Sequence, residues 1–194
     1  MKTTIFREKT RELVHLLAKP FVILRIHPNI ISVLALISVC FVFITVKREM
    51  YVLTSLLILI NGLFDLIDGD VARNLGKNSR FGKFLDRTID KISDAIILAA
   101  FVVYGLVGIK LGIYTIAAMF IATNISANIE GVLRFKISDA VSLRFVRTAI
   151  LIILITLKQF WLMFIILAIL STYALLYRFG MACYYHLSRT KKNV

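Results

Sequence analysis

Long runs of apolar residues constrain the fold of this chain more than any other feature. Six runs cover about residues 30–46, 51–69, 86–108, 111–131, 145–158 and 160–180. Most have the ~17–25 residues with which an α-helix crosses a bilayer, and residues 139–144 could extend the shorter fifth run. The hydrophobic share of 59% also exceeds the ~50% of soluble domains. We therefore predict an all-α integral membrane protein with six transmembrane helices.

The segments between the runs are short, which bears on domain organisation and packing. None is long enough for a second domain, so residues 1–194 are predicted to form a single membrane-embedded domain. The connections 47–50, 109–110 and 158–160 are very short. The helices on either side of each are therefore predicted to pack as antiparallel hairpins.

The basic residues predict the topology. All but four of the 24 Lys and Arg residues lie in the N-terminal segment, in the connections after the second and fourth runs, or at the C-terminal end; the exceptions are Lys47, Arg48, Lys110 and Lys158. By the positive-inside rule, both termini and the connection after the second run face the cytoplasm of a cell-membrane protein. The net charge of +13 then favours anionic lipid headgroups and phosphorylated substrates over nucleic acid, because the basic residues stay next to the membrane.

Residues 2–25 are predicted to form an amphipathic helix along the membrane surface. Apolar residues recur near helical spacing, and charged residues lie on another face; the apolar set is Phe6, Leu13, Leu16, Leu17 and Phe21, and the charged set is Arg7, Lys9, Arg11 and Glu12. A simple basic anchor for topology is the alternative. Pro28 disfavours helix at His27, and Asn29 is the predicted N-cap of the first span.

Carboxylates at the ends of the second and third runs are the main chemical feature. Asp65 and Asp68 are three residues apart, and Asp86 and Asp90 are four apart, with Asp94 one further turn on. Each pair shares a helical face, so two antiparallel helices can point four carboxylates at one another. Because close like charges repel, a divalent cation is the usual compensation, and oxygen ligands suit Mg²⁺ or Mn²⁺ rather than Zn²⁺.

Simple solvated helix ends are the alternative reading, with these carboxylates paired to neighbouring cations such as Arg73 or Arg87. The position of Gly69 directly after Asp68, and of Gly82 four residues before Asp86, favours function, because glycine lets backbone approach a ligand or helix closely. Arg73 lies one helical turn after Gly69 and can offer a fork of donors to a phosphate. The histidines carry no surrounding motif and are predicted to be surface or interface residues; they are His15, His27 and His186.

The stretch from Asp65 to Asp90 resembles the signature of the CDP-alcohol phosphotransferase family, D-x2-D-G-x2-A-R-x8-G-x3-D-x3-D. Every fixed element stands at the required interval: Asp65, Asp68, Gly69, Ala72, Arg73, Gly82, Asp86 and Asp90. The six predicted spans, the N-terminal helix and Pro28-Asn29 before the first span are also similar to the family. The resemblance covers nearly the whole chain.

The resemblance implies transfer of a phosphate-linked group from a CDP-activated lipid to a small polar alcohol, with release of CMP. It implies that Asp65, Asp68 and Asp86 hold two Mg²⁺ or Mn²⁺ ions, with Asp90 close by as a further metal residue and as the base for the attacking hydroxyl. It further implies a homodimer. The nucleotide and diphosphate residues would be Gly69, Ala72, Arg73 and Gly82.

The acceptor is predicted from a second resemblance. The stretch SRFGKFLDRTIDKISDAIIL is similar to the branch that makes phosphatidylinositol phosphate or its ether-lipid counterpart. That branch has an Asp followed by Arg or Lys, and a later Asp, which here resemble Asp90-Lys91 and Asp94. Inositol phosphate is therefore the expected acceptor. That branch has two arginines before a glutamate in the fourth span, and aligned on Glu130 this chain has Ser126 and Asn128 there.

This departure leaves the acceptor open. Either the acceptor is an uncharged polyol, or its phosphate is bound by basic residues of the connection after the fourth run. The candidate acceptor residues are Asp94, Asn128, Arg134 and Arg144. Glycerol phosphate as acceptor and CDP-inositol as donor remain alternatives.

A divalent-cation transporter is the alternative from another class, since clustered carboxylates in membrane segments also occur there. Transport sites lie near the bilayer midplane, whereas these carboxylates lie at one membrane side. Residues 51–57 and 99–106 carry no acidic relay towards the other side. CMP release from a CDP-lipid discriminates between the two classes.

Overall fold

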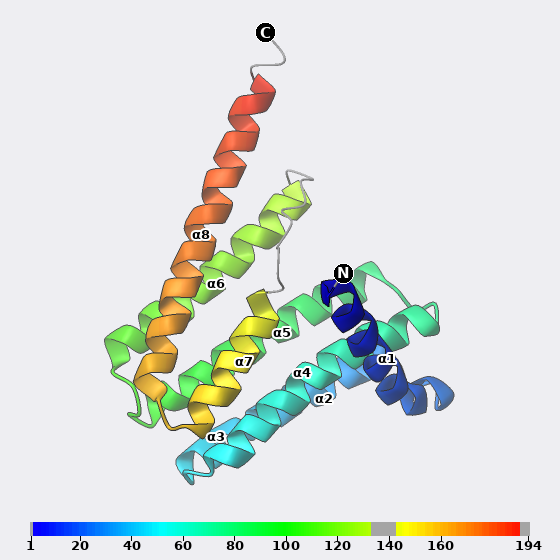
Figure 1. The fold of residues 1–194 in the computed structure, drawn as a ribbon, viewed down its shortest axis with the longest axis horizontal. Coiled ribbons are helices and arrows are strands. Elements are labelled where there is room, and N and C mark those ends of the chain that lie inside the picture. Colours follow the sequence, from blue (N-terminus) through cyan, green and yellow to red (C-terminus); the bar gives the residue numbers. More distant parts are fainter. Residues whose placement is uncertain (1, 133–142, 191–194) are drawn as a thin grey trace. The chain divides into compact units, whose positions relative to one another are not determined.

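The computed structural model describes residues 2–132 and 143–190. This described part consists of helices joined by short turns (Figure 1). The helices are α1 (Lys2–Ile23), α2 (Pro28–Cys40), α3 (Val42–Lys47), α4 (Tyr51–Asn74), α5 (Arg80–Val103), α6 (Ile109–Val132), α7 (Leu143–Thr156) and α8 (Phe160–Thr190). Two compact units divide the chain, Met1–Ile97 and Leu98–Val194. The single domain stays a prediction.

Every predicted apolar run lies largely in helix. The first run is split at Phe41 into α2 and α3, and the others lie in α4 to α8 in order. Within residues 2–132 and 143–190, three segments are long and apolar enough to cross a membrane, namely Pro28–Lys47, Tyr51–Asn74 and Phe160–Tyr185. The apolar parts of α6 and α7 are shorter, Ile109–Ile125 and Val146–Thr156. The helices are therefore confirmed, and the count of six crossings stays a prediction.

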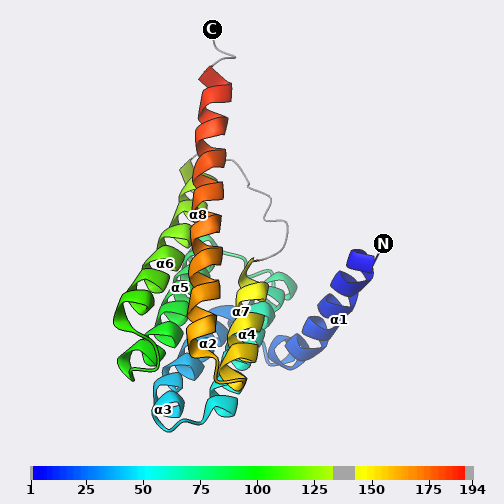
Figure 2. The same ribbon diagram turned by 60° about the vertical axis from the view of Figure 1, so that its left-hand side comes forward.

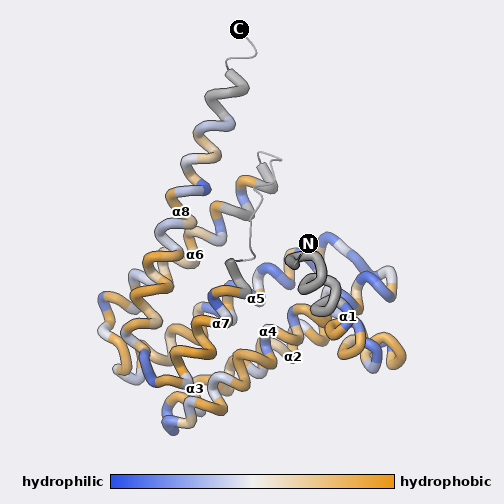
Figure 3. Tube along the Cα trace, in the orientation of Figure 1, coloured by the Kyte–Doolittle hydropathy of each residue, from blue (hydrophilic) through white to orange (hydrophobic). Residues whose placement is uncertain are grey.

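Hydropathy along the trace separates the apolar helices from the acidic segment. Figure 3 shows apolar residues along most of α2, α3 and α4, and a hydrophilic stretch from the end of α4 into the start of α5. This hydrophilic stretch contains the carboxylates and basic residues between Asp65 and Asp90. The polar chemistry of the unit is thus concentrated at one end of two helices.

Left-handed residues end five of the helices. They have positive φ and are Arg25, Glu49, Gly76, Gly105 and Lys158. In each case the next amide donates to a carbonyl five residues back, as Met50 does to Thr45 at 2.9 Å, which is the Schellman ending. The predicted hairpins after α3 and α7 do pack, as α3 on α4 and α7 on α8. Because α5 ends at Val103, the connection to α6 is longer than predicted.

The first predicted N-cap is wrong by two residues. His27 is extended, with φ −70° and ψ 132°, and is itself the N-cap of α2. Its Nδ1 accepts a 3.3 Å hydrogen bond from the amide of Asn29. Proline has no amide hydrogen and its φ suits the first helical position, so α2 begins at Pro28 and the cap moves to the residue before it.

Helix α1 packs on α4 in the Met1–Ile97 unit (Figure 1), and in the other unit α6 lies beside α8 (Figure 2). Ala18 is buried in a cluster with Ile31, Ile67 and Val71, and Phe21 packs against this cluster. The predicted apolar face of the N-terminal helix is therefore divided. Phe21 turns inward, whereas Leu13, Leu16 and Leu17 are exposed. A helix is present at Lys2–Ile23, whereas its amphipathic character and its position along a membrane stay a prediction.

Polar contacts join the helices within each unit. In the first unit, Asn61 of α4 donates to the carbonyl of Ala35 of α2 at 3.1 Å. In the second unit, α6 packs on α8, and the buried Arg178 of α8 donates to the carbonyl of Ala122 at 3.0 Å. Such hydrogen bonds satisfy polar groups that have no water partner inside a bilayer.

Candidate metal centre

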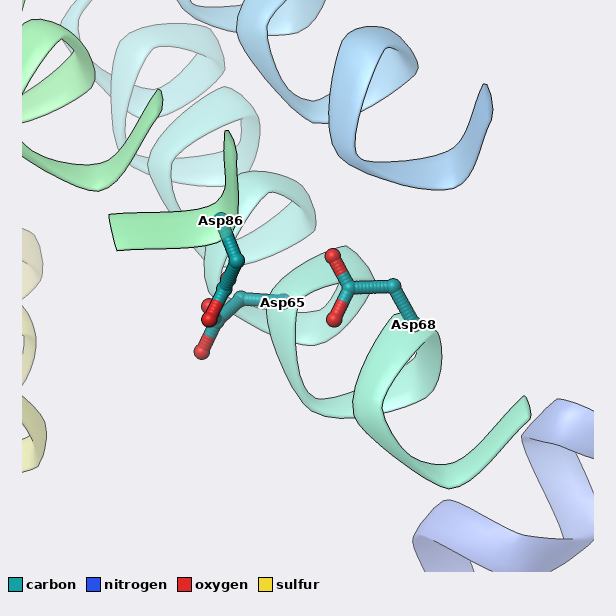
Figure 4. Close-up of side chains that lie close together, drawn as sticks. All are labelled: Asp65, Asp68 and Asp86. Atoms are coloured by element: carbon teal, nitrogen blue, oxygen red, sulfur yellow. The ribbon is translucent and has the colours of Figure 1, made fainter. Parts of the chain in front are cut away.

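Three carboxylates from two helices meet in the Met1–Ile97 unit. Asp65 and Asp68 lie on α4 and Asp86 lies on α5, and one oxygen of each is within 4.8 Å of the others. Figure 4 shows the three side chains turned towards a common point. Asp68 is buried, and the other two are half-buried. The predicted convergence of the two helix ends is thus confirmed for these three residues.

The local sequence explains why the two helices can present these side chains. The interval of three residues puts both α4 carboxylates on one face of that helix. Helix α5 begins after Ser79, whose hydroxyl accepts a 2.8 Å hydrogen bond from the amide of Gly82. A serine in this role is a favoured N-cap. Because α5 starts there, Asp86 lies in its second turn.

A serine from a third helix contacts the cluster. The hydroxyl of Ser32 on α2 donates to Oδ2 of Asp68 at 2.5 Å, and both residues are buried. The second oxygen of Asp68 keeps its lone pairs for another partner. Ser32 therefore orients this carboxylate through one of its two oxygens.

The donor set fits a hard divalent cation. Mg²⁺ and Mn²⁺ take carboxylate oxygens at about 2.0–2.2 Å and Ca²⁺ at about 2.3–2.6 Å, so two oxygens on opposite sides of one ion lie ~4–5 Å apart. The three carboxylate oxygens lie within 4.8 Å of one another, which one Ca²⁺ spans directly and one Mg²⁺ spans once the oxygens close in by about 0.6 Å. All three ligands are oxygens, which disfavours Zn²⁺. The three carboxylates can therefore hold a metal ion together.

The fourth carboxylate of the motif lies outside this group of three. Asp90 is one turn along α5 from Asp86 and half-buried, and Asp94 follows one turn later, also half-buried. Residues four apart share a helical face, so Asp90 is presented on the same side of α5 as Asp86. Its part in metal binding and catalysis stays a prediction.

The other motif residues surround the carboxylates in sequence and in space. A β-carbon added at Gly69 would lie 3.6 Å from Nη1 of Arg73, so the guanidinium passes over that glycine as the spacing predicted. A β-carbon at Gly82 would lie 3.1 Å from Oγ of Ser79 and 3.5 Å from Oδ1 of Asn29. Gly82 therefore brings the start of α5 close to α2. Ala72 is half-buried.

The predicted acceptor residues are only partly described. Asn128 is an exposed residue of α6 in the Leu98–Val194 unit, and Asp94 belongs to the other unit. Arg134 lies outside the described residues, as does the side chain of Arg144. The acceptor residues therefore stay a prediction.

Sequence reasoning missed three side chains that contact the motif directly or through Asp70. Ser32 binds Asp68, and Asp70 binds both Arg73 and His15. Ser32 is a lone serine in an apolar run, Asp70 stands at a variable position of the signature, and His15 is 55 residues from its partner. The one sequence signal that could have pointed to these contacts was the charged residue Asp70, two residues after Asp68.

Fold and site together define a class, that of helical membrane proteins with a cluster of carboxylates, able to hold a metal ion, at the ends of two helices. Within it, a family model described as CDP-alcohol phosphatidyltransferase matches residues 25–177. The chain belongs to this family. The match includes the whole Asp65–Asp90 signature and extends over both compact units.

Two similar proteins carry names for different acceptors. An archaetidylinositol phosphate synthase of Pyrococcus horikoshii is 32% identical over 101 residues, which are 52% of this chain and 54% of that protein. A CDP-diacylglycerol–glycerol-3-phosphate 3-phosphatidyltransferase of Aquifex aeolicus is 37% identical over 65 residues, 34% of this chain and 36% of that protein. The chain therefore spans about half or less of the length of these relatives.

A solved structure has the same fold. The phosphatidylinositol phosphate synthase of Mycobacterium tuberculosis, crystallised with CDP-DAG bound, superposes with a TM-score of 0.76. The match covers 88% of this chain and 94% of that one, at 18% sequence identity. At this identity the likeness establishes the shared fold.

Proposed function

We propose that this protein transfers a phosphatidyl-type group from a CDP-activated lipid to the hydroxyl of a small polar alcohol and releases CMP, in phospholipid biosynthesis. The observation that carries the proposal is the approach of Asp65, Asp68 and Asp86 to within 4.8 Å inside a complete family signature. Inositol phosphate is the proposed acceptor. It is supported by the name of the Pyrococcus relative and by the resemblance of the stretch around Asp90 and Asp94.

The proposed metal site holds two Mg²⁺ or Mn²⁺ ions between Asp65, Asp68 and Asp86, with Asp90 as a further ligand. When bound, such ions neutralise the charge of the donor diphosphate and stabilise the CMP leaving group. With Asp90 included, the four carboxylates would carry four negative charges, which two divalent cations match. Ser32 keeps one oxygen of Asp68 in place for this purpose.

In the proposed reaction, the acceptor hydroxyl oxygen forms a bond to the phosphorus that carries the lipid. The bond from that phosphorus to the bridging oxygen of the diphosphate breaks, and CMP leaves with its electron pair. Asp90 takes the hydroxyl proton; a carboxylate within ~3 Å of the hydroxyl can act as this base. Arg73 donates to the diphosphate, and Gly69, Ala72 and Gly82 leave room for the cytidine.

The membrane setting follows from the lipid donor. A CDP-lipid keeps its chains in the bilayer while its headgroup reaches the cytoplasmic ends of α4 and α5. We propose that all six apolar runs cross the membrane, that both termini and the site face the cytoplasm, and that the protein forms a homodimer. The exposed Leu13, Leu16 and Leu17 of α1 would then contact the inner leaflet.

An acceptor screen tests this proposal. Purified protein is mixed with Mg²⁺ or Mn²⁺, a CDP-lipid, and inositol phosphate, inositol, glycerol phosphate or serine in turn, and CMP release is measured. We expect release with inositol phosphate that stops when the metal is chelated. No CMP release with any acceptor would overturn the reaction class and favour the cation transporter.

Glycerol phosphate is the second candidate acceptor. The name of the Aquifex relative favours it, as do Ser126 and Asn128 at positions where the inositol-phosphate branch has arginines. In the same screen, release that occurs with glycerol phosphate and is absent with inositol phosphate would select this candidate. Either result is compatible with the proposed metal site and with a CDP-lipid as the donor.

Metal binding is tested directly, without turnover. The fraction of Mn²⁺ bound to the protein is measured by electron paramagnetic resonance for the wild type and for Asp86→Asn. We expect Asp86→Asn to weaken Mn²⁺ binding by at least tenfold, because it removes one charged ligand. Glu49→Gln is the matched control, since Glu49 is an exposed carboxylate beyond the other end of α4. Equal binding by both variants would contradict the proposed site.

A further inference from the structure

Asp70 lies two residues after Asp68 and turns to a different side of α4. Residues two apart in a helix are separated by about 200°, so Asp70 does not join the three clustered carboxylates. Its side chain is 8% exposed and accepts three hydrogen bonds. The donors are Nδ1 of His15 at 3.1 Å, Nη2 of Arg73 at 3.2 Å and Nδ2 of Asn74 at 3.0 Å. A buried carboxylate with this many donors is a fixed anchor for the groups around it.

Asp70 holds Arg73 by one nitrogen of its guanidinium. Nη2 donates to Oδ1 of Asp70, while Nη1 lies 3.6 Å from the place of a β-carbon at Gly69. The guanidinium is thus fixed over the glycine that adjoins Asp68. The Arg73 side chain is nevertheless 63% exposed. Because a guanidinium has five donor hydrogens, most of them remain for a ligand.

Helix α1 supports the other side of Asp70. His15 precedes Ala18 by one turn, and Ala18 is buried at 1% exposure against Ile67 and Val71 of α4. Phe21 packs on Phe64, with ring centroids 6.5 Å apart. These contacts hold α1 on α4 (Figure 1), so His15 meets Asp70 from a helix that is itself docked.

We propose that Asp70 is a positioning residue that presents Arg73 to the diphosphate of the CDP donor, and that His15 of α1 supports Asp70 in this role. The inference rests on the proposed function, because it takes the donor to be a CDP-lipid. A long arginine side chain loses rotamer freedom when it binds a ligand. Asp70 fixes the guanidinium before the donor arrives, so less freedom is lost on binding. His15 and Asn74 occupy the other carboxylate oxygen, which keeps Asp70 in its rotamer.

The test measures CDP binding by titration calorimetry and, separately, KM and kcat for the CDP-lipid. Asp70→Asn has nearly the same volume but loses the charge and one acceptor oxygen. We expect about tenfold weaker CDP binding and a similar rise in KM, since a hydrogen bond to a charged group is lost. Turnover at saturating CDP-lipid and Mn²⁺ binding should stay within twofold. A purely structural role would lower kcat and the melting temperature as well.

A double-mutant cycle separates action through Arg73 from any other effect. We expect Arg73→Ala to weaken CDP binding and Asp70→Asn to add nothing in the Arg73→Ala background, because coupled residues are non-additive. Additive effects would overturn the proposal. Glu49→Gln is the control for loss of a carboxylate near the same helix.

His15 supplies a second variant that does not alter α4. His15→Ala should weaken CDP binding about threefold, a fraction of the effect of a charged hydrogen bond, and His15→Gln, whose amide can donate to Asp70, should restore it in part. Unchanged CDP binding by His15→Ala would remove α1 from the proposal even if Asp70→Asn failed to fold. If the wild type binds CDP and releases CMP but the cycle is additive, only this inference fails. If the wild type does neither, the proposed function fails and this inference with it.

Discussion

Ser32 on α2 donates a 2.5 Å hydrogen bond to Oδ2 of Asp68 on α4, and both side chains are buried. This contact joins α2, which carries none of the motif residues, to the carboxylate cluster. Hydrogen bonds to metal-ligating carboxylates fix the orientation of the ligand and tune its affinity. The contact therefore makes the packing of α2 on α4 part of the proposed metal site.

Ser32→Ala should weaken metal binding while the fold is retained. The loss of one hydrogen bond next to a ligand typically lowers metal affinity ~10–100-fold. The measurement is the Mn²⁺ concentration that gives half-maximal CMP release. Ser38→Ala is the matched control, because the Ser38 hydroxyl donates to the carbonyl of Ala35 within α2 itself. Identical Mn²⁺ requirements of the two variants would show that Ser32 does not act on the metal site.

Asp90→Asn should leave donor binding largely intact and abolish transfer. The amide has almost the same shape but cannot take the hydroxyl proton, and loss of a general base costs ~10²–10⁴-fold in rate. CMP release at saturating CDP-lipid measures the rate, and calorimetric titration with CDP measures donor binding. Near-normal turnover of this variant would defeat the assignment of Asp90 as the base.

Gly69→Ala should keep the fold and lose donor affinity. A β-carbon there would meet only Nη1 of Arg73, at an ordinary 3.6 Å, and alanine in a helix interior stabilises by about 0.4–1 kcal/mol where it fits. A methyl group beside the proposed nucleotide site should raise KM for the CDP-lipid about tenfold, or ~1.4 kcal/mol. Gly180→Ala is the control, since nothing lies within 4 Å of its added carbon. A variant with normal KM would place the cytidine elsewhere.

Phe21→Ala should loosen α1 from α4. Phe21 is half-buried against the cluster of Ala18, Ile31, Ile67 and Val71, so the expected loss is roughly 2 kcal/mol, below the ~3–5 kcal/mol for a fully buried phenylalanine. Thermal unfolding in detergent and the rate of proteolysis within α1 measure the effect. Leu17→Ala on the exposed side of the same helix should change neither. Equal sensitivity of the two variants would argue against the observed docking of α1.

Some features could be predicted from local sequence because they depend on short-range geometry. Apolar run length places the helices, and intervals of three and four residues place Asp65 beside Asp68 and Asp86 beside Asp90 on shared faces. The complete signature then pointed to the family, and the family model confirms it. The N-cap at Asn29 was wrong because proline at the first helical position outweighs the capping preference of asparagine.

The sequence by itself determined which residues are apolar enough for helices in a membrane and which carboxylates share a helical face, since both are properties of neighbouring residues. Only the tertiary structure decided that Ser32 meets Asp68 across 36 residues and that His15 meets Asp70 across 55. It also decided that Phe21 turns to the core while Leu13, Leu16 and Leu17 stay exposed. The physical reason is that such contacts depend on how α1 and α2 pack against α4, and the spacing along one helix carries no record of its neighbours.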